Sequence, residues 1–81
     1  MFYVYILRCG DGTLYCGYTN NVEKRLEAHR SGKGAKYTKG RLPLELVYAE
    51  KFAEKGDALR REAEIKKLSK KEKLNIIKEG L

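Results

Sequence analysis

The sequence predicts an α+β domain with the element order ββαβαα, in which a three-stranded, mainly antiparallel sheet is covered by helices. Three observations predict it. Two segments of strand-type composition flank a glycine-rich turn near the start of the chain. A third such segment occurs later and is followed by signals for the starts of two helices. The chain has only 81 residues. A chain of this length holds one hydrophobic core. We therefore treat residues 1–81 as a single domain.

The first two strands form a hairpin. Residues 2–8 are rich in aromatic and β-branched side chains, residues 10–12 are Gly-Asp-Gly, and residues 13–18 return. Two loop lengths compete. A two-residue loop at 11–12 places Tyr5 and Tyr15 on opposite faces, because side chains alternate with a period of two.

A three-residue loop at 10–12 instead pairs Cys9 with Thr13 and places Tyr5, Tyr15 and Gly17 on one face. The other face then becomes a continuous apolar layer, made of Val4, Ile6, Leu14, Cys16 and Tyr18. We expect the three-residue loop because it sorts the side chains better. It also turns the two cysteines to opposite faces, which argues against a disulfide.

The first helix is expected to begin at Asn20. Asparagine is a good N-cap, and Glu23 stands three residues later, as in a capping box. Gly32 suits the position that ends the helix. A glycine-rich basic loop over residues 32–42 follows.

Three more elements complete the order. Residues 44–52 predict a third strand, and a second helix is expected from near Asp57 to about Leu68. Ser69 with Glu72 forms another capping-box pattern, so a third helix should run to about residue 79.

The charge balance favours a polyanionic partner. Eighteen Lys and Arg against eleven acids give a formal net charge of +7. The bases of the central loop occur without any acid among them and are Arg30, Lys33, Lys36, Lys39 and Arg41. The lysines of the later helices are interleaved with Glu, which is typical of a solvated helix face.

Two cysteines make no disulfide framework, and the chain lacks a signal-peptide pattern or an apolar run of membrane-spanning length. We therefore expect a cytoplasmic protein with reduced thiols.

One carboxylate stands out on the second helix. On a helical wheel Glu62 falls in the arc of Ala58, Leu59 and Ile65. A charge on an apolar arc needs a partner, because burial of an unpaired charge is very costly. Two partners remain open: an Arg or Lys side chain, or a hard cation such as Mg²⁺, which is held by one or two carboxylates with waters and phosphates.

Other groups are ambiguous when taken alone. Arg25 and His29 are four residues apart and share a helix face, and the pattern favours a surface arginine with a half-buried histidine. Four of the six tyrosines fall in the hairpin, where tyrosines usually pack. A tyrosine hydroxyl can also donate to a phosphate or, if cations lower its pKa, accept a proton.

The full order of motifs resembles a known family. The motifs are Tyr3-Val4-Tyr5, Tyr15-Cys16-Gly17, Tyr18-Thr19-Asn20, Arg25, His29, Tyr37-Thr38, Leu59-Arg60-Arg61-Glu62 and Ile65-Lys66-Lys67. Together they resemble the GIY-YIG nuclease superfamily, and in particular its small stand-alone bacterial members. The match covers nearly the whole chain. It departs at Tyr3, where the signature has glycine, and at Cys16, where it has isoleucine.

The resemblance implies a role for each matched residue. Tyr5 and Tyr15 would lie beside the scissile phosphate, and one of them would help to activate the attacking water. Arg25 would stabilise the charge on the phosphoryl oxygens, and Glu62 would anchor one divalent metal, Mg²⁺ or alternatively Mn²⁺. His29 would assist proton transfer, which leaves Tyr5, Tyr15 and His29 as rival general bases.

The function that follows is a metal-dependent endonuclease that hydrolyses phosphodiester bonds of nucleic acid, DNA rather than RNA, in repair or processing. We expect a monomer. The expected nucleic-acid contacts are Gly17, where close packing leaves no room for a side chain, and the loop residues Arg30, Lys33, Lys36, Tyr37, Lys39 and Arg41.

Two alternatives stay open. One is a non-catalytic nucleic-acid-binding module, in which Tyr37 stacks on a base. The other is a subunit that gains activity from a protein partner through the last helix, around Leu74, Ile76, Ile77 and Leu81, although the simpler expectation is that these residues cap the core.

Overall fold

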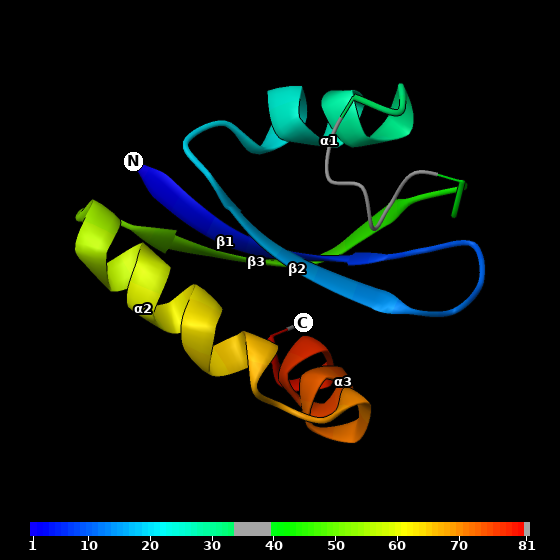
Figure 1. Ribbon diagram of the computed structural model, residues 1–81. Helices are drawn as coiled ribbons and strands as arrows, with labels where there is room; N and C mark the ends of the chain where they lie inside the picture. Colours follow the sequence, from blue (N-terminus) through cyan, green and yellow to red (C-terminus); the bar gives the residue numbers. More distant parts are fainter. Residues whose placement is uncertain (34–39, 81) are drawn as a thin grey trace.

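A three-stranded antiparallel sheet lies between one helix on one face and two helices on the other (Figure 1). The computed structural model describes residues 1–33 and 40–80. The elements are β1 (Phe2–Arg8), β2 (Leu14–Thr19), α1 (Val22–Arg30), β3 (Glu45–Phe52), α2 (Lys55–Lys66) and α3 (Lys70–Glu79). The sheet order is β2-β1-β3, with both neighbouring pairs antiparallel. The predicted fold class and element order are confirmed.

The hairpin has the three-residue loop. Cys9 N–H donates to the Thr13 carbonyl at 2.8 Å, and Gly12 N–H donates to the Cys9 carbonyl at 2.9 Å. Gly12 has a φ of 85°, a conformation that glycine adopts without steric cost. In the resulting register Tyr5 lies opposite Gly17. The expected register is therefore confirmed.

Each face of the sheet carries its own core. Under α2 and α3 lies a cluster whose buried members are Val4, Ile6, Cys16, Ala58 and Ile65. Under α1 lies a second cluster whose buried members are Tyr5, Leu7, Cys9 and Leu44, with Tyr15 and Leu26 packed against it. The two thiols are unpaired and belong to different clusters, as the alternation predicted.

The start of α1 differs from the prediction by one residue. Asn21, not Asn20, is the N-cap, with extended backbone angles and a side-chain oxygen that accepts from Lys24 N–H at 3.0 Å. The capping box expected with Glu23 is therefore wrong, because the third helical residue is now Lys24. Gly32 follows the C-cap with a φ of 81°, as a helix-ending glycine should.

The second helix begins at Lys55, two residues before the predicted start, and ends at Lys66. Its buried residues are Ala58 and Ile65, whereas Leu59 is 41% exposed. The expectation that Leu59 lies on the buried face of α2 is wrong. The half-buried residues on that side of the helix are Arg61 and Glu62.

The last helix follows the predicted pattern. Ser69 and Glu72 form the expected capping box. Ile76 and Ile77 are half-buried against the first cluster, and Leu74 is exposed. Residue 81 lies outside the described residues. Within the described ranges, every helix is too short or too polar to cross a membrane.

Candidate active site

Three aromatic side chains from three elements meet on the α1 side of the sheet: Tyr5 of β1, Tyr15 of β2 and His29 of α1. Tyr5 Oη and His29 Nε2 are 2.8 Å apart in the interior. Tyr15 lies edge-on to His29, with ring centroids 5.3 Å apart, and its ring centroid is 6.4 Å from that of Tyr5. The structure therefore brings together three of the five predicted catalytic side chains.

The three side chains of this cluster differ in how deeply they are buried. Tyr5 is 3% exposed and His29 is 1% exposed, whereas Tyr15 is half-buried. His29 is thus more deeply buried than the helix pattern indicated. Its ring is satisfied by the Tyr5 hydroxyl, which donates to Nε2 when the imidazole proton is on Nδ1.

Gly17 leaves room for the Tyr5 ring. The two residues are paired across the hairpin, and a Cβ built at Gly17 would lie 2.5 Å from Tyr5 Cζ. That approach is far below van der Waals contact and involves a ring fixed by the core. A glycine is needed here so that the Tyr5 ring can cross β2 toward His29.

Burial holds all three aromatic groups uncharged near neutral pH. It raises the pKa of Tyr5 far above its ordinary value of 10, and Tyr15 adds to this while Arg25 opposes it. The pKa of Tyr15 is also raised by burial, against the opposing charges of Lys66 and Arg25. The pKa of His29 is lowered from 6.5 by burial and by Arg25.

Arg25 stands at the solvent side of this cluster. It is exposed on α1, and its charge acts on all three aromatic groups. With Thr19, Asn20 and neighbouring α1 residues it lines a shallow pocket of about 280 Å³. A guanidinium in this position can meet an anion that approaches the tyrosines.

Glu62 approaches the tyrosines from α2. Its side chain is 20% exposed, and its carboxylate lies 3.4 Å from Lys66 Nζ, one helical turn away. Its charge adds to the burial that raises the pKa of Tyr5 and of Tyr15. Lys66 is therefore a partner of this carboxylate within the chain.

A cluster of three or more His, Cys, Asp or Glu that could hold a metal ion does not occur in the described ranges. A divalent cation bound at Glu62 would therefore have this carboxylate as its protein ligand, with water and substrate phosphate completing the set, an arrangement that Mg²⁺ accepts.

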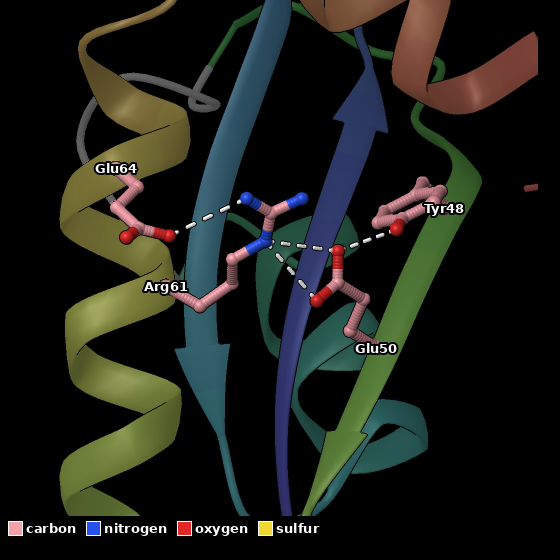
Figure 2. A network of polar contacts seen from close by, with 4 residues as sticks. All are labelled: Tyr48, Glu50, Arg61 and Glu64. Atoms are coloured by element: carbon pink, nitrogen blue, oxygen red, sulfur yellow. Dashed lines mark hydrogen bonds and ion pairs between the residues drawn. The ribbon is translucent and has the colours of Figure 1, made fainter. Parts of the chain in front are cut away.

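A second polar network fixes the helix that carries Glu62. Figure 2 shows Arg61 of α2 reaching Glu50 of β3. Arg61 Nε donates to both Glu50 carboxylate oxygens at 3.1 Å, and Arg61 Nη1 donates to Glu64 at 3.4 Å. The Tyr48 hydroxyl also donates to Glu50. Sequence reasoning missed Glu50, although an acid two residues after Tyr48 on the covered face of a strand was a usable signal.

The predicted nucleic-acid loop is described only at its two ends. Arg30 Nη2 donates to the Leu44 carbonyl at 3.1 Å, and Arg41 pairs with Asp11 of the hairpin. Both arginines therefore brace the chain as well as carrying charge. Lys33 is exposed. The predicted contacts Lys36, Tyr37 and Lys39 lie outside the described residues.

Comparison with known proteins places this arrangement in a family. The model of the GIY-YIG catalytic domain matches residues 1–75. The UPF0213 protein SH2523 of Staphylococcus haemolyticus is 57% identical over 77 residues, which cover 95% of this chain and 94% of that protein. The UPF0213 protein NP_0776A of Natronomonas pharaonis is 55% identical over 75 residues, covering 93% and 88% of the two chains.

Two solved structures are similar. The solution structure of the UPF0213 protein BH0048 from Bacillus halodurans has a TM-score of 0.63 and 49% identity, and covers 96% of this chain and 84% of that chain. That of EF2693 from E. faecalis has a TM-score of 0.66 and 45% identity, with coverages of 94% and 81%. The chain therefore belongs to the GIY-YIG catalytic domain family, with small UPF0213 proteins as its close relatives.

Proposed function

We propose that the chain is a metal-dependent endonuclease that hydrolyses phosphodiester bonds of DNA. The observation that carries the proposal is the buried cluster of Tyr5, Tyr15 and His29. Burial keeps its groups uncharged, and the charges of Arg25 on α1 and Glu62 on α2 act on both tyrosines. Membership of a nuclease-type family and the net charge of +7 support it.

The exposed members of the site would meet the substrate. Arg25 would contact the phosphoryl oxygens, where positive charge stabilises the transition state. Of the two tyrosines of the cluster, Tyr15 has the more exposed surface, so it would touch the phosphate or the attacking water. Tyr5 and His29 lie inside and would hold Tyr15 in place.

The buried pair also offers a route for a proton. A neutral imidazole can accept a proton, and His29 is kept neutral by burial and by Arg25. The Tyr5 hydroxyl already contacts His29 Nε2. We therefore assign proton uptake to the Tyr5–His29 pair. In this assignment the Tyr5 hydroxyl would pass its proton to His29 Nε2 as it takes one from the attacking water, and Tyr15 would contact the phosphate.

Glu62 would hold one divalent metal, Mg²⁺ or Mn²⁺. Its half-buried carboxylate near both tyrosines fits a site that takes its other ligands from water and phosphate. When bound, the ion supplies Lewis-acid stabilisation of charge on the phosphate and the leaving oxygen. Lys66 would have to release the carboxylate, or share it, for this to occur.

The test is a cleavage panel of single-stranded, duplex, branched and damaged DNA, with RNA alongside, in Mg²⁺ or Mn²⁺. We expect Glu62→Gln and Arg25→Ala each to slow cleavage by roughly a hundredfold or more while the fold persists. Glu79→Gln is the control, an exposed acid at the end of α3. Absence of cleavage by the wild-type chain with every ion, or full activity of Glu62→Gln, would reject the proposal.

A non-catalytic DNA-binding module is the second candidate. The ion pair between Glu62 and Lys66 favours it, because the carboxylate is satisfied without a metal. This candidate predicts salt-sensitive DNA binding that Glu62→Gln leaves unchanged, with no cleavage under any condition of the panel.

A further inference from the structure

We propose that the junction of α2 and α3 is a second nucleic-acid-binding surface, which holds the phosphodiester backbone of DNA beside the candidate active site. We call it the junction lysine surface, and it consists of Lys66, Lys67, Lys70, Lys71 and Lys73. The inference rests on the proposed function. It departs from the sequence-based expectation that these lysines belong to an ordinary solvated helix face.

The positive charge of this surface is only partly offset by nearby acids. Residues 66–73 contain five lysines and a single acid, Glu72. The Glu72 carboxylate is engaged in the capping box, where it accepts from Ser69 N–H at 3.0 Å. Across residues 1–33 and 40–80, ion pairs to an acid occur at Lys66 but at none of the other four lysines.

The surface begins at the candidate active site. Lys66 pairs with Glu62, which itself lies near Tyr5 and Tyr15. Lys73 is half-buried and, with Lys66, acts on the Cys16 thiol of β2, whose pKa burial raises to about 11. Cys16 follows Tyr15 in β2, and its side chain lies on the other face of the sheet, in the cluster under α2 that also contains Ile65. Because Ile65, the residue before Lys66, packs in one buried cluster with Cys16, the junction lies next to the strand that carries Tyr15. Lys67, Lys70 and Lys71 have exposed side chains.

Two of these lysines occupy positions that helix stability disfavours. Lys70 and Lys71 are the first two residues of α3, close to its unpaired N–H groups. The helix dipole makes a cation unfavourable there and an acid favourable. A sequence that served stability alone would have other residues at these positions. A polyanion bound at the junction would interact favourably with these two lysines and offset the unfavourable interaction with the helix dipole.

The ends of the predicted loop differ from the junction. Arg30 and Arg41 are held by partners within the chain, the Leu44 carbonyl and the Asp11 carboxylate. Lys67, Lys70 and Lys71 instead have exposed side chains. Among the basic groups of the described ranges, the junction combines three exposed lysines, an excess of positive charge and an ion pair to Glu62.

The experiment compares two variants that lower the net charge equally. The junction variant is Lys67→Gln/Lys70→Gln/Lys71→Gln, which spares Lys66 because of its contact with Glu62. The control variant is Lys51→Gln/Lys55→Gln/Lys78→Gln, which removes three exposed lysines elsewhere.

Binding of a short labelled DNA duplex is followed by fluorescence anisotropy over a range of NaCl concentrations, with Ca²⁺ in place of Mg²⁺. We expect the junction variant to bind roughly tenfold or more weakly near 0.1 M salt, and its slope of log K against log salt to fall by about 2.7, since each phosphate contact contributes about 0.9. The control variant should keep the wild-type slope. The melting temperature of the junction variant should be equal to or above that of the wild-type chain, because two cations leave the start of α3.

Equal losses of affinity in the two variants would mean that net charge alone matters, and would overturn the inference. Absence of DNA binding by the wild-type chain would overturn it too. So would a fall in the melting temperature of the junction variant that accounts for the lost binding. Cleavage measured in Mg²⁺ separates this inference from the proposed function. A chain that binds through the junction but cuts nothing retains the inference and loses the nuclease. A chain that cuts DNA while both variants bind alike retains the nuclease and loses the inference.

Discussion

The Tyr5 hydroxyl and His29 Nε2 form a buried hydrogen bond of 2.8 Å between the central strand and α1. The bond belongs to the fold and to the candidate site at once. It satisfies two polar groups inside the second core, and it fixes the ring of Tyr5 over Gly17 and beside Tyr15. Changes to either residue should therefore alter both stability and chemistry.

Tyr5→Phe should lower the free energy of unfolding by about 1–3 kcal/mol, because the substitution removes the buried hydrogen bond between the Tyr5 hydroxyl and His29 Nε2. Urea unfolding measures the effect. Tyr18→Phe is a matched control in the same hairpin on the opposite face, and should change stability by less than about 0.5 kcal/mol. Equal stability of Tyr5→Phe and the wild-type chain would show that the bond contributes nothing.

The face of the sheet on which each hairpin side chain lies could be predicted from the sequence, because it depends on local rules. A period of two and one loop length decide which side chains share a face, and they placed Tyr5 and Gly17 together correctly. The choice between Asn20 and Asn21 as N-cap could not be made, since two adjacent identical residues offer the same chemistry.

Contacts between elements were beyond such rules. The bond from Tyr5 to His29 joins residues 24 apart in sequence and depends on how α1 lies across the sheet. The contact of Arg61 with Glu50 depends likewise on the position of α2. The Lys66 partner of Glu62 is visible as an i,i+4 spacing, yet the sequence could not choose between lysine and metal.

Gly17→Ala should destabilise the protein by about 1–3 kcal/mol, because the new methyl group overlaps the Tyr5 ring and the core must shift. Gly56→Ala is the control. Gly56 lies in the first turn of α2, and a methyl group there would meet no atom within 4 Å, so alanine should be neutral or stabilising by up to about 1 kcal/mol. Thermal unfolding of the two variants should move in opposite directions. A neutral Gly17→Ala would mean that Tyr5 is not confined as the structure indicates.

Stability should depend on pH through the same buried groups. The folded pKa of His29 is lowered, so its contribution is present above the unfolded pKa of about 6.5 and is lost as the pH falls through the folded pKa. The folded pKa of Tyr5 is raised, so its contribution is present below about pH 10 and is lost as the pH rises through the folded value.

Urea unfolding at a series of pH values measures both arms of this dependence. In His29→Leu the free energy of unfolding should decrease less steeply just below about pH 6.5 than in the wild-type chain. Asp11 is separable, since hydrogen bonds from Thr13 and pairing with Arg41 lower its pKa to about 2 and its effect falls at more acidic pH. An unchanged acid arm in His29→Leu would assign that arm to other groups.

Arg61→Gln should destabilise the protein more than Arg60→Gln, although the two residues are neighbours on α2. Arg61 and Glu50 have side chains that are 32% and 22% exposed, and their contact uses both carboxylate oxygens (Figure 2). Loss of the guanidinium removes two hydrogen bonds from a largely covered carboxylate that keeps the one from the Tyr48 hydroxyl, at a cost of about 1–2 kcal/mol. The pair of Arg60 with Asp57 is exposed, so its loss should cost less than about 0.5 kcal/mol.

The same comparison tests how α2 is held at the site. Because Arg61 ties α2 to β3 one residue before Glu62, Arg61→Gln should also reduce cleavage in the nuclease assay under conditions where the variant is fully folded, and Arg60→Gln should not. A variant that unfolds more easily but cleaves at the wild-type rate when folded would limit the Glu50–Arg61 contact to stability. Equal unfolding free energies for the two arginine variants would show that burial of the Glu50 contact adds nothing to an exposed pair.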